Sequence, residues 1–457
     1  MLNIKELVEA TSGNLLNGDI KFIPKEYVID SRNIENSPFF VPIVGENTDG
    51  HKYILNAVED GICGYFINKG FEKKEEVVNK SREINKNIII IEVEDTKEAL
   101  YNAGVYNRNK HIDIPVVAVT GSVGKTSTRE MISSVLSASR NVLTTTKNYN
   151  SIIGAPIMAL KMDGQDVCVF EIGTDHKGEI ERLSNLVKPD IGVITMIGTA
   201  HIGIFGSKDE IFKEKSSIVS HMKEGSTLVV NGDDEYLKTL KSNDKYHVVT
   251  FSENEIVDLE EKNDIFFKTN IYDSLEDITI NQIGSHNAKN AVCAIKVAEI
   301  LGIEKQSIIK GIENYKNFSR RLEKINLKNN VLLIDDTYNA SIDSVKSGLK
   351  TVNKIKNRRK IAVLGDMLEL GDMSKQLHEE VGETFKELDF KALYLTGKES
   401  KYILETASKH VLTKYFENID ELISNLKLNI KENDVIYLKA SNGMRFDKIV
   451  KALKELY

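Results

Sequence analysis

The chain has 457 residues, of which 41% are apolar and 28% are charged, a composition typical of a folded globular protein. At roughly 100–200 residues per domain, this length corresponds to about three domains. The formal net charge of −7, without a long run of lysine and arginine, argues against a nucleic-acid-binding surface, and we expect no nucleic-acid partner.

The amino-terminal residues 1–14 are predicted to form an amphipathic helix without the continuous apolar segment of a secretory signal. The longest apolar runs, at 88–91 and 114–119, are far shorter than the roughly 20 residues of a membrane-spanning helix. Cys63, Cys168 and Cys293 are widely separated among apolar neighbours, which argues against disulfides and a zinc site. We therefore expect a cytoplasmic protein without a membrane span.

Residues 1–110 are predicted to form a small mixed α/β domain. Short strand-like stretches at 27–30, 39–44 and 88–92 lie among helical segments, with a turn rich in Gly, Asn and Asp at 45–50. Near residue 112 the pattern changes to alternating strands and helices.

The rest of the chain favours parallel sheets covered by helices. Continuous apolar strands are predicted at 116–120, 167–171, 191–195 and 227–231, and again at 331–335, 360–364, 392–396 and 435–438. We therefore predict an α/β protein with three domains: the small domain at 1–110, a central parallel-sheet domain at 111–316 and a C-terminal Rossmann-like domain at 317–457.

A glycine-rich turn with a lysine and a threonine follows the strand at 116–120. The backbone N–H groups of such a turn, together with the amino terminus of the next helix, bind phosphate oxygens. Lys125 would reach the β- and γ-phosphates, and the Thr126 hydroxyl would bind Mg²⁺. A glycine-rich turn can also be a simple chain reversal, but the Lys-Thr pair at this spacing favours nucleotide binding. The predicted nucleotide contacts are Gly121, Ser122, Val123, Gly124, Lys125, Thr126 and Ser127.

The loop has the short form G-x-x-G-K-[ST], from Gly121 to Thr126. In this form it resembles the ATP loop of the Mur ligase and folylpolyglutamate synthetase superfamily, which joins a carboxylate to an amine with ATP. The segments 30–34 and 40–51 resemble the UDP-sugar-binding domain of the late Mur ligases, which folylpolyglutamate synthetases lack. The resemblance thus implies a central ATPase domain and an N-terminal UDP-sugar domain, with substrate contacts from Ser31, Arg32, Gly45, Asp49 and His51.

Glu171 at a strand end and His201 after the next strand are candidate metal ligands. Taken singly, such residues are more often structural or simply exposed. In the Mur ligases, however, the matching Glu and His bind Mg²⁺, and a carbamylated lysine follows in the next helix. The resemblance therefore implies two Mg²⁺ ions with Thr126, Glu171, His201 and carbamylated Lys215 as ligands. The alternative for Lys215 is a solvated lysine.

Further motifs imply contacts to the nucleotide and substrate. Segment 147–154 resembles the family's Asn-x-Asn-Asn-x-Ile-Gly with Ser151 at the second adjacent Asn, and 284–290 resembles its His-Asn-x-x-Asn. The segment 318–323 resembles the one that brings an arginine to the ATP phosphates, either Arg321 or Arg320. The implied roles are a substrate contact for Asn150, adenine and nucleotide contacts for Asn287 and Asn290, phosphate contact for Arg321, ribose contact for Asp335, and positions facing the reacting groups for Tyr338 and Asn339.

Two strings, 335–340 and 363–371, resemble the branch of the family that adds D-alanyl-D-alanine to UDP-MurNAc-tripeptide. Asp-Asn-Pro-Arg, usual in the branch that adds the third residue, is absent, and Asn442 replaces a usual arginine. The resemblance implies peptidoglycan precursor synthesis through an acyl phosphate, with Lys125, Glu171, His201, Lys215 and Arg321 as catalytic residues. It leaves open lysine or diaminopimelate as the third residue of the tripeptide.

The expected small-molecule partners are ATP, UDP-MurNAc-tripeptide and D-Ala-D-Ala, and we expect a monomer. The C-terminal domain must close on the central one to reach ATP, so we predict a hinge near residues 314–320. Two alternatives are another amide ligase of this superfamily with a different acceptor, and a catalytically silent nucleotide-binding protein.

Overall fold

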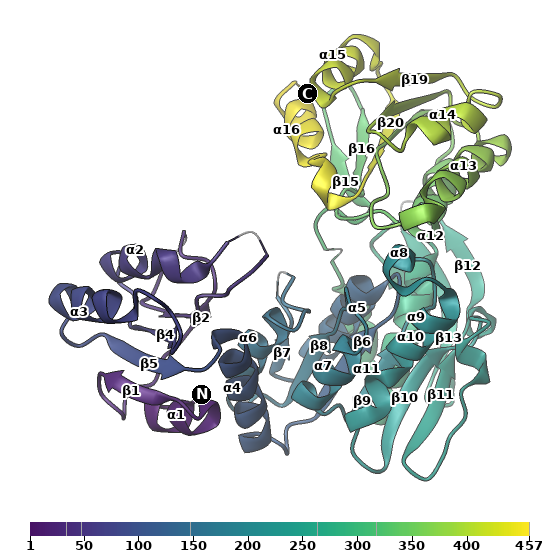
Figure 1. Cartoon of the computed structure of the whole chain (residues 1–457). Helices are drawn as coiled ribbons and strands as arrows, with labels where there is room; N and C mark the ends of the chain where they lie inside the picture. The colour runs from purple at the N-terminus through teal and green to yellow at the C-terminus, as the bar shows by residue number, and fades with distance from the viewer. Residues whose placement is uncertain (33, 47, 147, 263, 317, 457) are drawn as a thin grey trace.

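Four sheets organise the part of the chain that the structure, a computed structural model, describes: residues 1–32, 34–46, 48–146, 148–262, 264–316 and 318–456. Residues 33, 47, 147 and 317, which fall within predicted motifs or the predicted hinge, lie outside the described residues. In Figure 1 the purple N-terminal elements and the green to yellow C-terminal elements lie on different sides of the teal central elements.

The N-terminal sheet has the order β1-β5-β4-β3-β2, with β1 antiparallel to β5 and the other neighbours parallel. The predicted strand at 39–44 is shorter than expected because Pro42 has no N–H for the ladder. The elements are α1 (Ile4–Thr11), β1 (Asn14–Asn17), β2 (Tyr27–Val28), β3 (Phe39–Phe40), α2 (Ile54–Glu59), β4 (Gly64–Asn68), α3 (Lys74–Ile84) and β5 (Ile89–Val93).

Helix α4 (Thr96–Lys110) joins the N-terminal and central parts. Its residues Ala99, Leu100 and Ala103 share a core with Ile157 and Leu160 of α6 (Gly154–Leu160). A Cβ at Gly104 would lie 3.0 Å from the Pro156 Cα, so the glycine lets the two helices approach closely.

The central sheet is parallel throughout, with the order β11-β10-β9-β6-β8-β7. Strand β6 lies between β8 and β9, and the carboxyl ends of such strands border the crevice where ligands bind in open α/β sheets. The elements are β6 (Val116–Thr120), α5 (Lys125–Ser137), β7 (Val142–Thr144), β8 (Val167–Glu171), α7 (Glu179–Val187), β9 (Ile191–Ile194), α8 (Ile202–Phe205), α9 (Lys208–Ser216), β10 (Ser226–Asn231), β11 (Tyr246–Phe251), α10 (His286–Ile300) and α11 (Lys305–Glu313).

A three-stranded antiparallel sheet, β12-β13-β14, was not predicted. Its strands are β12 (Val257–Glu261), β13 (Ile265–Ile271) and β14 (Ser274–Ile280). Along β13 the side chains of Ile265, Phe267, Thr269 and Ile271 are buried while those between them are more exposed, the alternation of a half-buried strand. The signal was therefore a period of two rather than a continuous apolar run.

The C-terminal sheet has the order β15-β16-β20-β17-β18-β19, and only its edge strand β15 pairs antiparallel among the described strands. The predicted α/β class with parallel sheets is confirmed. The elements are β15 (Glu323–Asn326), β16 (Leu332–Asp335), α12 (Ile342–Asn353), β17 (Arg359–Leu364), α13 (Ser374–Thr384), β18 (Ala392–Thr396), α14 (Lys401–Ala407), β19 (Thr413–Phe416), α15 (Ile419–Asn429), β20 (Asp434–Lys439) and α16 (Asp447–Leu456).

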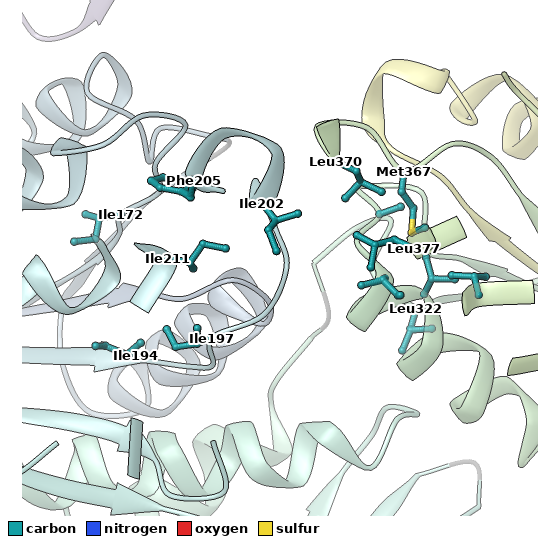
Figure 2. Packing of buried hydrophobic residues seen from close by; sticks show 14 of the residues in the cluster. Ile172, Ile194, Ile197, Ile202, Phe205, Ile211, Leu322, Met367, Leu370 and Leu377 are labelled. Atoms are coloured by element: carbon teal, nitrogen blue, oxygen red, sulfur yellow. The ribbon is translucent and has the colours of Figure 1, made fainter. Parts of the chain in front are cut away.

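One hydrophobic cluster includes side chains from both the central and the C-terminal parts. Figure 2 shows Ile202 of α8 on one side and Leu370 on the other, with Ile202 directed toward the side on which Leu370 lies. Across the described residues, no helix combines the length and the apolar character needed to cross a membrane.

Candidate active site

A cavity of about 980 Å³ lies between the central and C-terminal parts. The loop after β6, the ends of β8 and β9, and the start of α10 line it from the central part. Segments 321–322, 336–354 and Lys439 line it from the C-terminal part. Several predicted site residues meet in this lining: Ser122, Val123, Gly124, Lys125, Thr126, Ser127, Asn150, Glu171, His201, Asn290, Arg321, Tyr338 and Asn339.

The shape of the phosphate loop depends on the backbone conformation of its glycines. Gly121 and Gly124 have φ values of 142° and 87°, which favour glycine, and a Cβ at Gly121 would lie 2.0 Å from the Thr195 Oγ1. No side chain among the described residues caps α5, whose amino terminus faces the cavity. The buried Ser122 hydroxyl also has no hydrogen-bond partner among them. These groups suit the oxygens of a nucleotide phosphate.

Lys125 folds back onto its own loop. Its Nζ donates to the carbonyl oxygens of Gly121 at 2.8 Å and Ser122 at 3.3 Å. Burial lowers the pKa of Lys125, an effect that the nearby Glu171 carboxylate opposes. A phosphate in the loop would replace the weak carbonyl partners with an anion.

Glu171 is buried at the end of β8 and is held by two side chains. Asn150 Nδ2 donates to its Oε1 at 2.8 Å, and Arg129 Nε lies 3.5 Å from its Oε2. The sequence predicts a substrate contact for Asn150, and in this structure its amide group is bound to Glu171. Arg129 was not singled out from the sequence, because a basic residue after a phosphate loop ordinarily marks an exposed helix face.

His201 immediately precedes α8 in a left-handed backbone conformation, with φ of 60°, and its side chain forms no capping hydrogen bond among the described residues. Lys215 lies on α9 and is only 2% exposed, although it does not line the cavity. Burial, followed by the nearby Lys125 cation, lowers the pKa of Lys215 to about 7. Within the described part of the chain its ammonium forms no hydrogen bond or ion pair. A solvated lysine, the alternative from the sequence, does not describe this environment.

The donor chemistry suits Mg²⁺, which at phosphate sites is bound by one or two carboxylates with phosphate and water oxygens. Thr126 and Glu171 supply oxygen donors at the phosphate loop. The described residues hold no cluster of three or more His, Cys, Asp or Glu side chains that could bind a metal ion.

Arg321 crosses from the C-terminal part to the phosphate loop. Its Nη2 donates to the Thr126 Oγ1 at 3.0 Å, and its guanidinium lies 4.1 Å from the centre of the Tyr338 ring. The Tyr338 hydroxyl donates to Asn148 Oδ1 at 2.5 Å. Arg320 points elsewhere, to the Thr337 hydroxyl and carbonyl. Of the two candidate arginines, Arg321 lines the cavity.

Asp335 is buried and does not line the cavity. Its Oδ1 accepts from the backbone N–H of Thr337 at 3.1 Å and from the Thr337 hydroxyl at 2.7 Å, and burial raises its pKa. The next residue, Asp336, does line the cavity and accepts from Lys439 Nζ at 2.7 Å. Asp336 was missed because adjacent acids cannot be separated until the strand orientation is known. Lys439 was missed because the sequence does not show that β20 pairs with β16.

The cavity lining also includes apolar and amide groups. Phe251, Ile256 and Leu259 line the cavity together with Asn290. Asn287 is buried behind Asn290, which donates to the Asn287 Oδ1 at 3.3 Å, while Asn287 Nδ2 donates to the Ile283 carbonyl. The apolar wall was missed because it belongs partly to the antiparallel sheet that was not predicted.

The predicted N-terminal substrate contacts do not line this cavity within the described residues. His51 is buried, with Nδ1 2.6 Å from Asp49 Oδ1 and Nε2 accepting from the Asn68 N–H at 3.1 Å. Arg32 is 85% exposed and paired with Asp30 at 2.6 Å. Ser31 adjoins it, and the exposed Gly45 donates its N–H to the Thr48 carbonyl. Asp49 and His51 thus hold their own loop together.

A smaller cavity of about 220 Å³ shares Asn148, Ala200, His201 and the segment 338–341 with the large one. Its other wall consists of residues 368–370 and 441–443, which include Asn442. The two cavities therefore adjoin at His201 and Tyr338.

Comparison with known proteins identifies relatives over nearly the full length. The chain matches the models of the Mur ligase middle domain over residues 119–298 and of the Mur ligase glutamate ligase domain over 320–442. It is 32% identical to UDP-N-acetylmuramoyl-tripeptide–D-alanyl-D-alanine ligase of Bacillus subtilis (strain 168), covering 99% of this chain and 98% of that protein.

Two solved structures are also similar. MurF from Acinetobacter baumannii has a TM-score of 0.87 at 29% identity, with 99% of this chain and 98% of that chain covered. MurF from Thermotoga maritima in complex with ADP has a TM-score of 0.79 at 26% identity, with coverage of 94% and 97%.

Proposed function

We propose that this chain, which belongs to the Mur ligase family, is an ATP-dependent ligase that joins D-alanyl-D-alanine to UDP-N-acetylmuramoyl-tripeptide. The products are UDP-N-acetylmuramoyl-pentapeptide, ADP and phosphate. The observation that carries the proposal is the meeting of the phosphate loop with Arg321 in one cavity, at the 3.0 Å contact to Thr126.

The nucleotide lies along the cavity with its phosphates at the loop. The N–H groups of residues 121–127 and the Ser122 hydroxyl bind phosphate oxygens, and Lys125 leaves its carbonyl partners for the β- and γ-phosphates. The adenosine faces Phe251, Ile256 and Leu259, with Asn290 as the amide nearest the cavity and Asn287 behind it. A ribose contact from Asp335 requires its carboxylate to exchange the Thr337 hydroxyl for a ribose hydroxyl.

Thr126, Glu171 and His201 are the residues that would hold Mg²⁺, with Lys215 as a further ligand after carbamylation. The partly neutral amine that follows from a pKa of about 7 supports that modification, because only the uncharged amine attacks CO₂. When bound, Mg²⁺ neutralises phosphate charge during phosphoryl transfer.

The chemistry activates a carboxylate that is otherwise a poor acyl donor. The γ-phosphoryl group of ATP passes to the terminal carboxylate of the tripeptide, and ADP leaves. The amine of D-Ala-D-Ala then attacks the acyl phosphate and releases phosphate. Lys125 and Arg321 offset the repulsion between the two anions and hold the reacting groups in line.

The substrates approach from different sides. The tripeptide substrate is bound through its uridine end by the N-terminal domain, which includes Ser31, Arg32 and Gly45. The smaller cavity next to His201 and Tyr338 is the site for the dipeptide, with Asn339 and Asn442 in its wall. We assign these roles to a cytoplasmic monomer with domains at 1–110, 111–316 and 317–457.

The test is phosphate release from ATP with UDP-MurNAc-tripeptide, with and without D-Ala-D-Ala, followed by mass spectrometry of the product. Release that depends on both substrates, with a pentapeptide product, supports the proposal. Turnover with a different amine would instead support another amide ligase of the superfamily. ATP binding without turnover for any acceptor would support a silent nucleotide-binding protein.

A further inference from the structure

One carboxylate of the C-terminal part is hydrogen-bonded to the central part. Asp343, the second residue of α12, lines the large cavity. Its Oδ2 accepts from the Thr199 N–H at 3.0 Å and from the Thr199 hydroxyl at 3.1 Å. Thr199 lies in the central part, between β9 and α8. This contact therefore joins the two parts at a second place, apart from the contact of Arg321 to Thr126.

The acceptor for both donors of Thr199 comes from the other domain. Thr199 is only 7% exposed, and among the described residues its N–H and its hydroxyl donate to Asp343 alone. A buried donor that loses its acceptor costs more free energy than an average hydrogen bond contributes. Separation of the two domains would leave both donors to be satisfied by water.

The neighbours of Thr199 fit the carboxylate closely. A Cβ at Gly198 would lie 2.5 Å from Asp343 Oδ2, so a side chain at this position would displace the carboxylate. Ile197 and Ile342 belong to the hydrophobic cluster that includes side chains of both parts. The two hydrogen bonds therefore form beside an apolar contact, where the low local dielectric strengthens them.

The segment 196–199 also touches the phosphate loop. The Ser122 N–H donates to the Met196 carbonyl at 2.9 Å, and a Cβ at Gly198 would lie 3.3 Å from the Ser122 Cβ. The segment 196–199 thus connects α12 of the C-terminal part to the loop that is predicted to bind the nucleotide phosphates.

We propose that Asp343 is a positioning residue that holds the C-terminal domain on segment 196–199 and thereby places Arg321 opposite the phosphate loop. Its carboxylate has no cationic partner among the described residues, so it acts as a hydrogen-bond acceptor and not as one half of an ion pair. The inference rests on the proposed function, because that function gives Arg321 a phosphoryl group to act on.

An acidic residue in the first turn of a helix also stabilises the helix itself, and the test must separate the two effects. Asp420 is likewise the second residue of its helix, α15, and is exposed. Asp420→Ala is therefore the matched control, because it removes the same charge from the same helix position without removing a hydrogen bond between the domains.

Amide hydrogen exchange measured by NMR detects docking at a different contact between the domains. The Gly203 N–H of α8 donates to the Glu369 carbonyl of the C-terminal part at 3.2 Å, and Asp343 takes no part in that hydrogen bond. In Asp343→Ala we expect the Gly203 amide to exchange about 10-fold faster, because the docked arrangement has lost two hydrogen bonds. The amide of Val193 in β9 should keep its wild-type rate, which excludes general unfolding.

Turnover is the second readout. It should fall about 3- to 10-fold in Asp343→Ala, with a smaller loss of ATP affinity, because Arg321 lies opposite the phosphate loop for a smaller fraction of the time. Asp343→Asn should restore both the exchange rate and the turnover, since its amide oxygen can accept the same two hydrogen bonds. Asp420→Ala should match the wild type in both.

A wild-type rate of Gly203 exchange in Asp343→Ala overturns the inference, and so does faster exchange with unchanged turnover. A loss of turnover in Asp343→Asn as large as in Asp343→Ala, with slow Gly203 exchange retained, overturns it too, because the charge would then act on the reacting groups directly. Failure of the wild type to make any amide product, with Gly203 exchange still dependent on Asp343, counts instead against the proposed function.

Discussion

The two walls of the large cavity are built in different ways. The central wall is local: residues 121–127 follow one another between β6 and α5 and present backbone groups. The opposite wall consists of side chains from the C-terminal part, and its contact from Arg321 to Thr126 joins residues 195 positions apart. The first wall therefore exists in any arrangement of the domains, whereas the second exists only when they are docked. Substitutions in the two walls should accordingly impair different steps, ATP binding for the central wall and turnover for the opposite wall.

The largest effect is expected for Gly121→Ala, which changes the phosphate loop in the central wall. The new Cβ would collide with the Thr195 Oγ1, which itself donates to the Val123 carbonyl at 2.6 Å, so the loop must change shape. We expect the affinity for ATP to fall at least about 100-fold by calorimetry, since several phosphate contacts are lost together.

Gly61→Ala is the control for Gly121→Ala. Gly61 also has positive φ, at 95°, but nothing lies within 4 Å of a Cβ there. It should lower the free energy of unfolding by about 1 kcal/mol and leave ATP affinity unchanged. An unchanged ATP affinity in Gly121→Ala would show that the loop tolerates a side chain at residue 121, which would contradict the prediction.

Arg321→Ala removes a side chain from the wall that the C-terminal part contributes, the docked wall. We expect turnover to fall about 10²- to 10³-fold, because a cation on the transferring phosphoryl group is lost, with a smaller loss of ATP affinity. Arg320→Ala is the neighbouring control: it removes hydrogen bonds to Thr337 and should lower the melting temperature more than the turnover. Equal losses of ATP affinity and turnover in Arg321→Ala would show that Arg321 mainly binds the nucleotide and does not act on the transferring phosphoryl group.

Lys215→Met tests the buried lysine behind the central wall. We expect turnover to fall about 10-fold or more, together with loss of a carbamate signal in ¹³C NMR spectra of protein equilibrated with ¹³CO₂. Lys213→Met, an exposed lysine on the same helix, should retain both. A carbamate signal that persists without Lys215 would assign the modification to another amine.

The smallest effect concerns Asp335, which is buried next to the cavity-lining Asp336 and does not itself line the cavity. Burial raises its pKa, so the folded state holds this proton more tightly than the unfolded state does. The ionised carboxylate therefore costs stability above its folded-state pKa, and the cost disappears below its unfolded-state pKa. Asp335→Asn should raise the free energy of unfolding by roughly 1 kcal/mol at pH 7, with the gain vanishing toward pH 3.

Urea unfolding at both pH values checks the stability of Asp335→Asn, and calorimetry checks its ATP affinity, which should fall if Asp335 binds the ribose. A variant that is less stable than the wild type at pH 7 would mean that the hydrogen bonds to Thr337 need the full charge.

Sequence patterns predicted most strands of the largely parallel sheets, although not β1, β4, β7, β11, β15 or β19, and none of the antiparallel sheet. Strands β6, β8 and β18 have their predicted bounds, because a strand buried on both faces is a continuous apolar run. Strand β13 was missed because only alternate residues are buried, and such a pattern is weak over a few residues. Because the sheet of β12, β13 and β14 was not predicted, the apolar cavity lining that includes Leu259 of β12 was missed as well.

Within the candidate site, too, local features were predictable from the sequence and features set by tertiary packing were not. The sequence alone determined the phosphate loop, since Gly121, Gly124, Lys125 and Thr126 act through backbone geometry and short-range spacing. It could not separate Asp335 from Asp336, reveal that His51 is bound within its own loop, or bring Asp343 to Thr199. Those outcomes depend on which face of a strand turns inward and on how two domains dock, and both are set by packing between segments far apart in the chain.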